Sequence, residues 1–233
     1  MVLVTTIIPA YNEEKTIASV IIRTKQVLEE TDLQYRILVV DDGSTDHTAN
    51  IAENLGVEVL KNGTNMGKGT SLRNAFKLID DGIVIIMDAD DSHPPESIRY
   101  LLGPIINGGN VHVVGSRFIK GAISGVQPLN KLLNFLCNVF LSILFRIRIT
   151  DSQSGFRAIR ADTLKKLNLK SDGFEIETEI TIKSLTQGYR ILELPINCTK
   201  RRYGYSRLKL LKGGLGILRG IISSVLEMRR MRE

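Results

Sequence analysis

Two carboxylates follow an apolar run of the chain, in the sequence Asp88-Ala89-Asp90. The preceding residues 83–87 (Ile-Val-Ile-Ile-Met) predict a buried strand, and the side chains of an extended chain alternate between its two sides. Asp88 and Asp90 can therefore point the same way and share one divalent cation. Ligands of open α/β sheets bind beyond the carboxyl ends of the strands, so the pair predicts a metal site that faces a diphosphate. The alternative is an acidic turn ended by Pro94 and Pro95.

The composition is that of one large globular domain. The chain has 233 residues, of which 43% are hydrophobic, and a net charge of +6 that indicates an anionic partner: nucleotide phosphate, nucleic acid or an acidic membrane. Its two cysteines, Cys137 and Cys198, form neither a CxxC motif nor a Cys/His cluster, so no disulfide framework or zinc site is expected. A reducing, cytoplasmic setting fits, and the N-terminal sequence does not resemble a signal peptide.

Short apolar runs alternate with helical stretches along the first half of the chain. The expected strands are residues 3–9, 37–40, 57–60, 83–87 and 111–115, and the expected helices begin at Glu13, at Thr45, near Gly67 and after Pro95. Strands rich in Val, Ile and Leu that alternate with helices are typical of a parallel sheet covered on both faces. The sequence thus predicts the α/β class, with a Rossmann-like, doubly wound, mostly parallel sheet and amphipathic helices towards the C-terminus.

Three nucleotide-binding designs are excluded. The first strand ends in Pro9-Ala10-Tyr11-Asn12-Glu13-Glu14, without the glycine-rich turn of a dinucleotide fold or the Arg-containing loop of a nucleotidyltransferase. Residues 63–70 (Gly-Thr-Asn-Met-Gly-Lys-Gly-Thr) are one residue too short for a P-loop and have Gly69 in place of the metal-binding hydroxyl. The second strand ends in Asp41 and Asp42, which could accept hydrogen bonds from a base or a ribose.

Taken together, the motifs resemble the nucleotide-sugar domain of family 2 inverting glycosyltransferases of the dolichol-phosphate mannose synthase type, which have the GT-A fold and a DXD motif. The matching segments are Pro9-Ala10-Tyr11-Asn12-Glu13, Val40-Asp41-Asp42-Gly43-Ser44, Asn65-Met66-Gly67-Lys68-Gly69, Asp88-Ala89-Asp90 with Ser92-His93-Pro94-Pro95-Glu96, Gly115-Ser116-Arg117, Asp151-Ser152-Gln153-Ser154-Gly155-Phe156-Arg157 and Arg201-Arg202-Tyr203-Gly204-Tyr205-Ser206-Arg207-Leu208. They occur in the family's order and cover nearly the whole chain.

The resemblance implies transfer of a hexose from a nucleotide sugar to a polyprenyl (dolichyl) phosphate, with mannose from GDP-mannose as the first candidate. It implies that Asp88 and Asp90 hold Mg²⁺ or Mn²⁺, which neutralises the leaving diphosphate without proton transfer. Lys68 either adds positive charge there or is an ordinary solvated lysine. The residues implied to surround the donor are Pro9, Ala10, Tyr11, Asn12, Glu13, Asp41, Asp42, Gly43, Gly67, Lys68, Asp88, Ala89 and Asp90. The alternative is a UDP-sugar-dependent transferase of family 2 that acts on a lipid phosphate or a glycan hydroxyl.

The acceptor phosphate requires cationic and polar side chains. The candidates are Arg117, Lys131, Arg201, Arg202 and Ser206. Guanidinium groups offer paired donors to phosphate oxygens, and a phosphate that is already ionised can attack without a catalytic base. Asp151 has two interpretations: it is the base that a hydroxyl acceptor would need, or it orients Arg117 or Arg157.

Three positions depart from the family's usual pattern. Asp91 is a third acid where an apolar residue is usual. We expect it on the surface on the opposite face, and the alternative is a further role at the metal. Tyr205 replaces a Glu of related synthases, and Asn130 and Lys131 lie where some of them have an arginine. These differences bear on the sugar and the acceptor, because other members of the family use glucose or other sugars.

Two amphipathic stretches suggest contact with a membrane. Residues 132–149 are mostly apolar, with Asn134, Asn138 and Ser142 in one polar stripe, and are too short to span a bilayer. Residues 208–233 combine apolar residues with Lys and Arg, as do helices that lie on anionic membranes. The alternative for both is ordinary packing against the sheet.

We therefore expect a GT-A domain at residues 1–207, divided into a nucleotide-sugar half (1–117) and an acceptor half (118–207), followed by a basic amphipathic helix at 208–233. The expected location is the cytoplasmic face of a membrane, with peripheral attachment and a membrane-anchored protein as a further candidate partner. Nucleic acid is not an expected partner, because only 6% of the residues are aromatic and none form stacking platforms between Arg and Lys.

Overall fold

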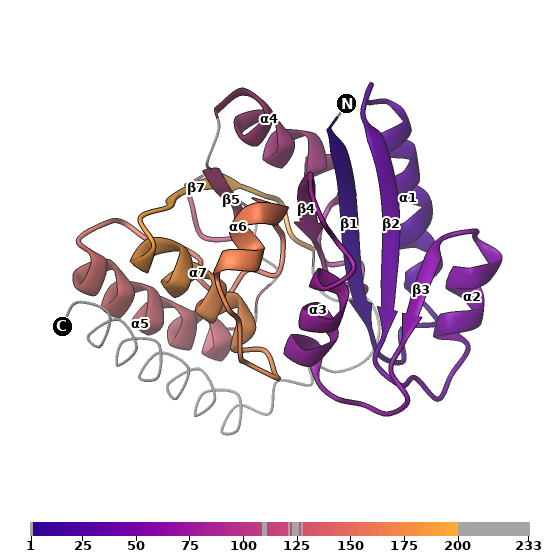
Figure 1. Cartoon of the computed structure of the whole chain (residues 1–233). Helices are drawn as coiled ribbons and strands as arrows, with labels where there is room; N and C mark the ends of the chain where they lie inside the picture. Colours follow the sequence, from indigo (N-terminus) through magenta and orange to yellow (C-terminus); the bar gives the residue numbers. More distant parts are fainter. Residues whose placement is uncertain (1, 109–110, 121, 123–125, 127, 200–233) are drawn as a thin grey trace.

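The computed structural model describes residues 2–108, 111–120, 122, 126 and 128–199. Within these residues a seven-stranded sheet has the order β3-β2-β1-β4-β6-β5-β7 (Figure 1). The strands are β1 (Leu3–Ala10), β2 (Gln34–Asp41), β3 (Glu58–Lys61), β4 (Ile83–Ile86), β5 (Val111–Ser116), β6 (Arg157–Arg160) and β7 (Arg190–Pro195). Only β6 runs antiparallel to its neighbours, so the predicted mostly parallel sheet is confirmed.

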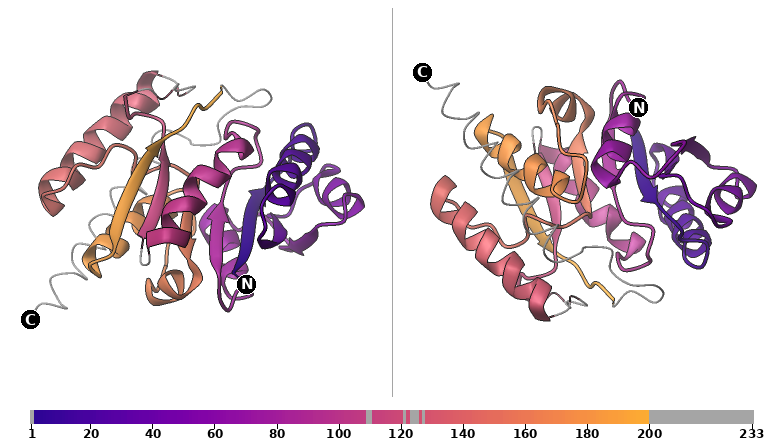
Figure 2. Two further views of the ribbon diagram at one scale, coloured as in Figure 1. Left: turned by 90° about the horizontal axis from the view of Figure 1, so that it is seen from above. Right: turned by 90° about the horizontal axis from the view of Figure 1, so that it is seen from below.

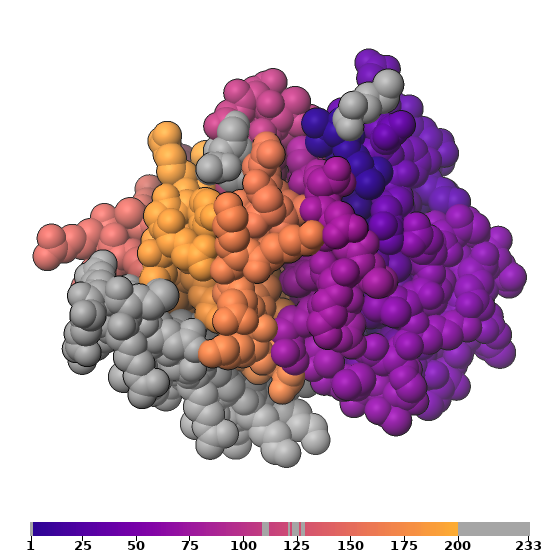
Figure 3. All heavy atoms as spheres, in the orientation of Figure 1, coloured from indigo at the N-terminus to yellow at the C-terminus, as the bar shows by residue number. Residues whose placement is uncertain are grey.

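Helices cover both faces of the sheet. They are α1 (Ile17–Glu29), α2 (Thr48–Asn54), α3 (Lys68–Phe76), the 3₁₀ helix η1 (Pro95–Ser97), α4 (Ile98–Gly108), α5 (Pro128–Phe145), α6 (Ala161–Lys166) and α7 (Ile176–Thr186). Apolar side chains of α1 and α4 form the core on one face, and those of α3, α6 and α7 form the core on the other. Every residue of β4 is buried, as its continuous apolar sequence predicts. Figure 3 shows α6 and α7 packed directly against the first half of the chain.

The antiparallel strand β6 was not predicted, and it brings the second half of the chain to the site. Ile86 at the carboxyl end of β4 pairs with Arg157 at the start of β6, and Val114 of β5 pairs with Arg157 from the other side. The loop that precedes β6 therefore reaches the edge of the sheet where β1, β2, β4 and β5 end. A parallel strand in this place would have carried that loop to the opposite edge.

The side chain of Arg157 holds the loop that precedes β6 in place. It is fully buried, and its guanidinium donates hydrogen bonds to the backbone carbonyls of Ser152, Ser154 and Glu177. Burial lowers the pKa of Arg157 to about 10, so it remains charged at neutral pH. The loop of residues 151–156 is thus tied to the first turn of α7.

Helix α5 has its polar side towards the protein and its apolar side outwards. Asn138 donates to the carbonyl of Thr150 (2.6 Å) and accepts from the backbone N–H of Ser152 (2.9 Å), while Ser142 Oγ accepts from the N–H of Ile149 (2.9 Å). The exposed apolar side chains are Leu129, Leu132, Leu133, Phe135, Leu136, Val139, Phe140 and Ile143. The predicted polar stripe is confirmed, and the helix ends at Phe145, four residues earlier than expected.

Both views of Figure 2 place α5 at the β7 end of the molecule, on the far side from α1. Among the described residues, no helix is both long and apolar enough to cross a bilayer. The predicted basic helix at 208–233 lies outside the described residues, so the predicted domain boundaries stay a prediction.

Candidate functional site

Asp88 lies in the loop that follows β4, at the carboxyl edge of the sheet. Its Oδ1 contacts the ammonium of Lys68, and its backbone N–H donates to Nδ1 of His93 (3.2 Å). Burial alone would raise the pKa of Asp88, but the positive charge of Lys68 outweighs this effect and holds that pKa well below its usual range. Asp88 is therefore a carboxylate at neutral pH, as a metal ligand must be.

Lys68 is a buried cation and not a solvated lysine. Its side chain is only 9% exposed, and its Nζ also lies 2.5 Å from Oε1 of Glu177, on α7. Burial alone would lower the pKa of Lys68, but the two carboxylates more than compensate and hold it above its ordinary value. One ammonium thus bridges a carboxylate of the predicted metal pair and a carboxylate of the second half of the chain.

The next two acids point in different directions. Asp90 Oδ1 accepts hydrogen bonds from the N–H (3.1 Å) and the hydroxyl (2.6 Å) of Ser92. Asp91 has a positive φ of 58°, is buried, and pairs with Arg23 of α1 at 2.6 Å. The expectation that Asp91 lies on the surface was therefore wrong. Short polar side chains tolerate this left-handed conformation, which turns the third carboxylate towards α1.

The donor set suits a divalent cation. Asp88 and Asp90 supply carboxylate oxygens, and the ammonium already lies against Asp88, which shows that a cation is accommodated there. Within the described residues no three His, Cys, Asp or Glu side chains are grouped closely enough to hold a metal by themselves. A metal held by one or two carboxylates, with substrate phosphates and water as its other ligands, is typical of Mg²⁺ and Mn²⁺ sites.

Asp42 organises the loop that leads into α3. Its carboxylate accepts hydrogen bonds from the backbone N–H groups of Met66 and Gly67 (both 2.9 Å), from Ser71 Oγ (2.8 Å) and from Asn62 Nδ2 (2.9 Å). This set of bonds fixes the position from which Lys68 extends. The direct contact of Asp42 with a nucleoside stays a prediction.

One carboxylate oxygen of Asp41 is available to accept a hydrogen bond from a ligand. Its Oδ2 accepts from the N–H of Ser44 (3.3 Å), whereas its buried Oδ1 has no hydrogen-bond partner among the described residues. A buried acceptor without a partner is costly, so a donor from a base or ribose would be favourable at this point. The loop beside it is held by Asn12, which donates its N–H to Ser44 Oγ (2.9 Å) and accepts from the N–H of Thr45 (2.7 Å).

The remaining predicted donor residues occupy the same edge of the sheet. Pro9 and Ala10 end β1, and Tyr11, Asn12 and Glu13 follow it. Gly43 follows β2, and Ala89 lies between Asp88 and Asp90. Gly43 has a φ of 74°, and a Cβ there would lie 2.5 Å from the carbonyl carbon of Thr64, so this position requires glycine.

The N-terminus of α3 is closed by the protein itself. The N–H groups of Gly69 (2.8 Å) and Thr70 (3.2 Å) donate to the carbonyl of Asp172, and a Cβ on Gly69 would lie 2.3 Å from the carbonyl oxygen of Ser171. The glycines around Lys68 therefore permit close packing between α3 and the segment before α7. They do not form a phosphate-binding loop, in agreement with the exclusion of a P-loop.

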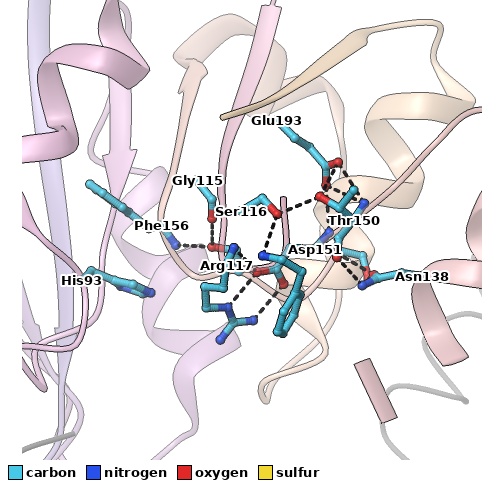
Figure 4. A network of polar contacts seen from close by, with 12 residues as sticks. His93, Gly115, Ser116, Arg117, Asn138, Thr150, Asp151, Phe156 and Glu193 are labelled. Carbon is cyan, nitrogen blue, oxygen red and sulfur yellow. Dashed lines mark hydrogen bonds and ion pairs between the residues drawn. The ribbon is translucent and has the colours of Figure 1, made fainter. Parts of the chain in front are cut away.

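Arg117 and Asp151 form the centre of the second cluster (Figure 4). Asp151 is fully buried and accepts three hydrogen bonds from Arg117: from the backbone N–H (3.0 Å), Nε (2.7 Å) and Nη2 (2.8 Å). Burial alone would lower the pKa of Arg117, but the opposing effect of Asp151 is larger and holds that pKa above its ordinary value. Asp151 thus pairs with Arg117, as one of its two interpretations expects, and its role in the reaction stays a prediction.

Glu193 of β7 holds the backbone of this cluster in place. Its carboxylate accepts from the N–H groups of Thr150 and Asp151 (both 2.8 Å) and from the hydroxyl of Thr150 (2.8 Å). Arg117 keeps Nη1 without a hydrogen-bond partner among the described residues, and Figure 4 shows its guanidinium on the side of the network that faces His93. This edge of the guanidinium can bind an anion.

His93 connects the two clusters. It is buried and stacks on Phe156, with the ring centroids 5.3 Å apart. Burial lowers its pKa below the ordinary value although Asp88 and Asp90 act in the opposite direction, so the ring is neutral at pH 7. Since Nδ1 accepts the N–H of Asp88, the proton is on Nε2.

Gly155 allows the loop before β6 to close over the pair of Lys68 and Asp88. A Cβ at this position would lie 2.9 Å from both Nζ of Lys68 and Oδ2 of Asp88.

Four residues predicted to bind the acceptor phosphate are not among the described residues of the two clusters. Lys131 is exposed in the first turn of α5 and makes no hydrogen bond or ion pair within the described residues. Arg201, Arg202 and Ser206 lie outside those residues.

Sequence reasoning also missed the roles of four residues: Glu177, Glu193, His93 and Gly155. Nothing in the sequence indicated a role for Glu177, because it is the middle one of three alternating acids, Glu175, Glu177 and Glu179, at the start of α7.

Residues 5–167 match the model of the family described as glycosyl transferase family 2. An undecaprenyl-phosphate mannosyltransferase of Micrococcus luteus is 32% identical over 217 residues, which cover 88% of this chain and 87% of that protein. A dolichol-phosphate mannosyltransferase of Pyrococcus furiosus is 33% identical over 213 residues, which cover 88% of this chain and 59% of that protein.

Two solved structures share the fold. Mannosyl-3-phosphoglycerate synthase from Rubrobacter xylanophilus aligns with a TM-score of 0.77 and 22% identity, over 100% of this chain and 76% of that one. Glucosyl-3-phosphoglycerate synthase from Mycobacterium tuberculosis, crystallised with Mn²⁺, UDP and glucosyl-3-phosphoglycerate, aligns with a TM-score of 0.74 and 23% identity, over 96% and 80%. These likenesses confirm the GT-A fold. The family match and the identity to the two mannosyltransferases go further, and they show that this chain belongs to glycosyl transferase family 2.

Proposed function

We propose that this protein transfers a hexose, with mannose from GDP-mannose as the first candidate, to a polyprenyl phosphate, with inversion at the anomeric carbon. This proposal rests mainly on one observation: the carboxylate of Asp151 accepts three hydrogen bonds from Arg117. A hydroxyl acceptor needs a base, and a carboxylate that is fully buried and accepts three hydrogen bonds from one arginine is poorly placed for that task. A phosphate acceptor is already ionised, and the open Nη1 edge of Arg117 suits it. The names of the relatives from M. luteus and P. furiosus agree with a lipid phosphate.

On the donor side, Asp88 and Asp90 would hold Mg²⁺ or Mn²⁺. The bound ion would neutralise the charge that develops on the leaving diphosphate. His93 orients Asp88 through the backbone, Asp42 positions the loop that carries Lys68, and Asp41 presents an acceptor oxygen to the nucleoside. The site thus separates into a carboxylate side for the donor and a guanidinium side for the acceptor.

We also propose that α5 lies on a membrane surface. Its outer side is apolar, with Ile143 73% exposed, and it is followed by the exposed Arg146 and Arg148. Apolar residues beside cations are typical of helices that bind anionic membranes without crossing them. The inner side of α5 bonds to the backbone of Thr150 and Ser152, so the same helix would contact the lipid surface and the acceptor cluster.

A matched pair of acceptors tests the function. Full-length protein with Mg²⁺ or Mn²⁺ and labelled GDP-mannose, UDP-glucose and other nucleotide sugars is given either a polyprenyl phosphate or the corresponding polyprenol. We expect labelled lipid from the phosphate and none from the polyprenol, with GDP-mannose as the best donor. Equal transfer to the polyprenol would contradict the phosphate acceptor, and preference for UDP-glucose would select the alternative donor.

Replacement of Asp151 by Asn tests whether this carboxylate is a base. The loss of a charged partner for Arg117 should lower kcat/KM for the acceptor by about tenfold to a hundredfold, since hydrogen bonds to charged groups contribute roughly 1.5–3 kcal/mol. The shape of the pH profile of kcat should not change. Asp162→Asn, which alters an exposed carboxylate, is the control. Loss of the acidic limb of the profile in Asp151→Asn would assign the base to Asp151.

Replacement of single acids tests the metal site. Asp88→Asn and Asp90→Asn should each reduce transfer by about a thousandfold with the fold retained, because each removes a charged metal ligand. Asp91→Asn should instead lower the melting temperature, since it removes the charge of a buried carboxylate that pairs with the partly exposed Arg23. It should keep Mn²⁺ binding and transfer at temperatures well below the melting temperature. Near-normal activity of Asp88→Asn would remove the metal from this position.

Charges introduced on the outer side of α5 test the membrane contact. Phe140→Glu with Ile143→Glu should reduce flotation with anionic vesicles by about tenfold, since binding depends on buried apolar area and on attraction to anionic lipid. Tyr100→Glu changes a residue of α4 that is 72% exposed and should leave flotation unchanged. Unaltered binding of the α5 variant would assign the membrane contact to residues 208–233.

A further inference from the structure

Lys68 lies between two carboxylates whose surroundings differ. The side chain of Asp88 is 30% exposed, whereas that of Glu177 is only 4% exposed. Among the described residues, the ammonium of Lys68 lies 2.5 Å from Oε1 of Glu177 and forms an ion pair with it. The ammonium therefore neutralises an accessible carboxylate and an enclosed one at once.

The two contacts differ in what their loss would cost. A buried charge without a partner is strongly unfavourable, so Lys68 cannot leave Glu177 without a large penalty. Asp88 is partly open to solvent, and another cation can take the place of the ammonium there. A divalent ion bound to Asp88 would repel an ammonium that stayed on the same carboxylate.

The backbone around Lys68 is fixed, which limits the exchange to its side chain. Lys68 is the first residue of α3, and the carbonyl of Asp172 holds the N–H groups of the next two residues. Gly155 has no Cβ at the point where one would lie 2.9 Å from the ammonium. The exchange therefore involves movement of the four-carbon side chain, with the helix and the covering loop in place.

We propose that Lys68 is an internal counter-ion that occupies Asp88 until a divalent cation displaces it, and that Glu177 is the positioning residue that retains Lys68 in the site. After the exchange the ammonium remains paired with Glu177, beside the position of the donor diphosphate. This inference rests on the metal site of the proposed function and adds to it a residue from the second half of the chain.

The test is the affinity of nucleotide-free, full-length protein for Mn²⁺, measured by electron paramagnetic resonance. Lys68→Met removes the competing cation, so Mn²⁺ should bind about tenfold more tightly than to the wild type. Glu177→Gln leaves Asp88 as the only carboxylate beside the ammonium, so Mn²⁺ should bind more weakly. The double variant Lys68→Met/Glu177→Gln has no buried unpaired charge and should bind Mn²⁺ more tightly than the wild type.

The exposed pair of Lys61 and Glu53 provides matched controls. Lys61→Met and Glu53→Gln make the same changes of charge away from the site and should leave Mn²⁺ affinity unchanged. Opposite shifts in the two single variants are the signature of competition, because a merely structural role of the ion pair would weaken Mn²⁺ binding in both.

Two outcomes separate this inference from the proposed function. Weaker or unchanged Mn²⁺ binding in both Lys68→Met and the double variant, with normal binding by the wild type, would overturn the exchange alone. Failure of the wild type to bind Mn²⁺ even with GDP or UDP present would overturn the metal site itself, and the exchange with it. A melting curve for each variant confirms that the folded protein is compared.

Discussion

A buried charge needs a partner of opposite sign, and three such partnerships hold the candidate site together. Lys68 joins the loop after β4 to α7, Arg117 joins the end of β5 to the segment before β6, and Arg23 of α1 holds the segment after the DXD acids. Each pair connects parts of the chain that are far apart in sequence. These ion pairs connect residues that lie mostly in loops.

The orientation of β6 makes these partnerships geometrically feasible. Because it runs against β4 and β5, its first residue lies at the edge where the parallel strands end, and the preceding loop faces Asp88. The carboxylates for the donor come from the parallel half of the sheet, and the chain that orients Arg117 arrives with the antiparallel strand. The boundary between the two directions of strand is thus also the boundary between the residues proposed for the donor and those proposed for the acceptor.

The sequence predicted the elements whose signals are local. β4 is a continuous apolar run, β1 and β2 each contain a shorter one, and the expected acids lie at the carboxyl ends of these strands. β6 was missed because its four residues begin and end with arginine, which is unusual for a central strand and is explained here by the backbone carbonyls that Arg157 binds. The burial of Asp91 was missed because it depends on Arg23, which is 68 residues away in the chain. The local sequence pattern identified the side chains that could bind a ligand. Ion pairs between residues far apart in the chain determine which of those side chains remain available.

The two-sided character of α5 has a consequence for lipid selection. If its outer side rests in the interface of a bilayer, as proposed, its inner side places the backbone of Thr150 and Ser152 at a fixed height above the hydrocarbon, because hydrogen bonds of 2.6–2.9 Å connect them. Arg117 then shares that height through Asp151. A lipid whose reactive oxygen stands farther from its chain, such as a polyprenyl diphosphate, would present that oxygen above the guanidinium instead of beside it. The helix would act as a vertical spacer that distinguishes headgroups by their length before their chemistry is recognised.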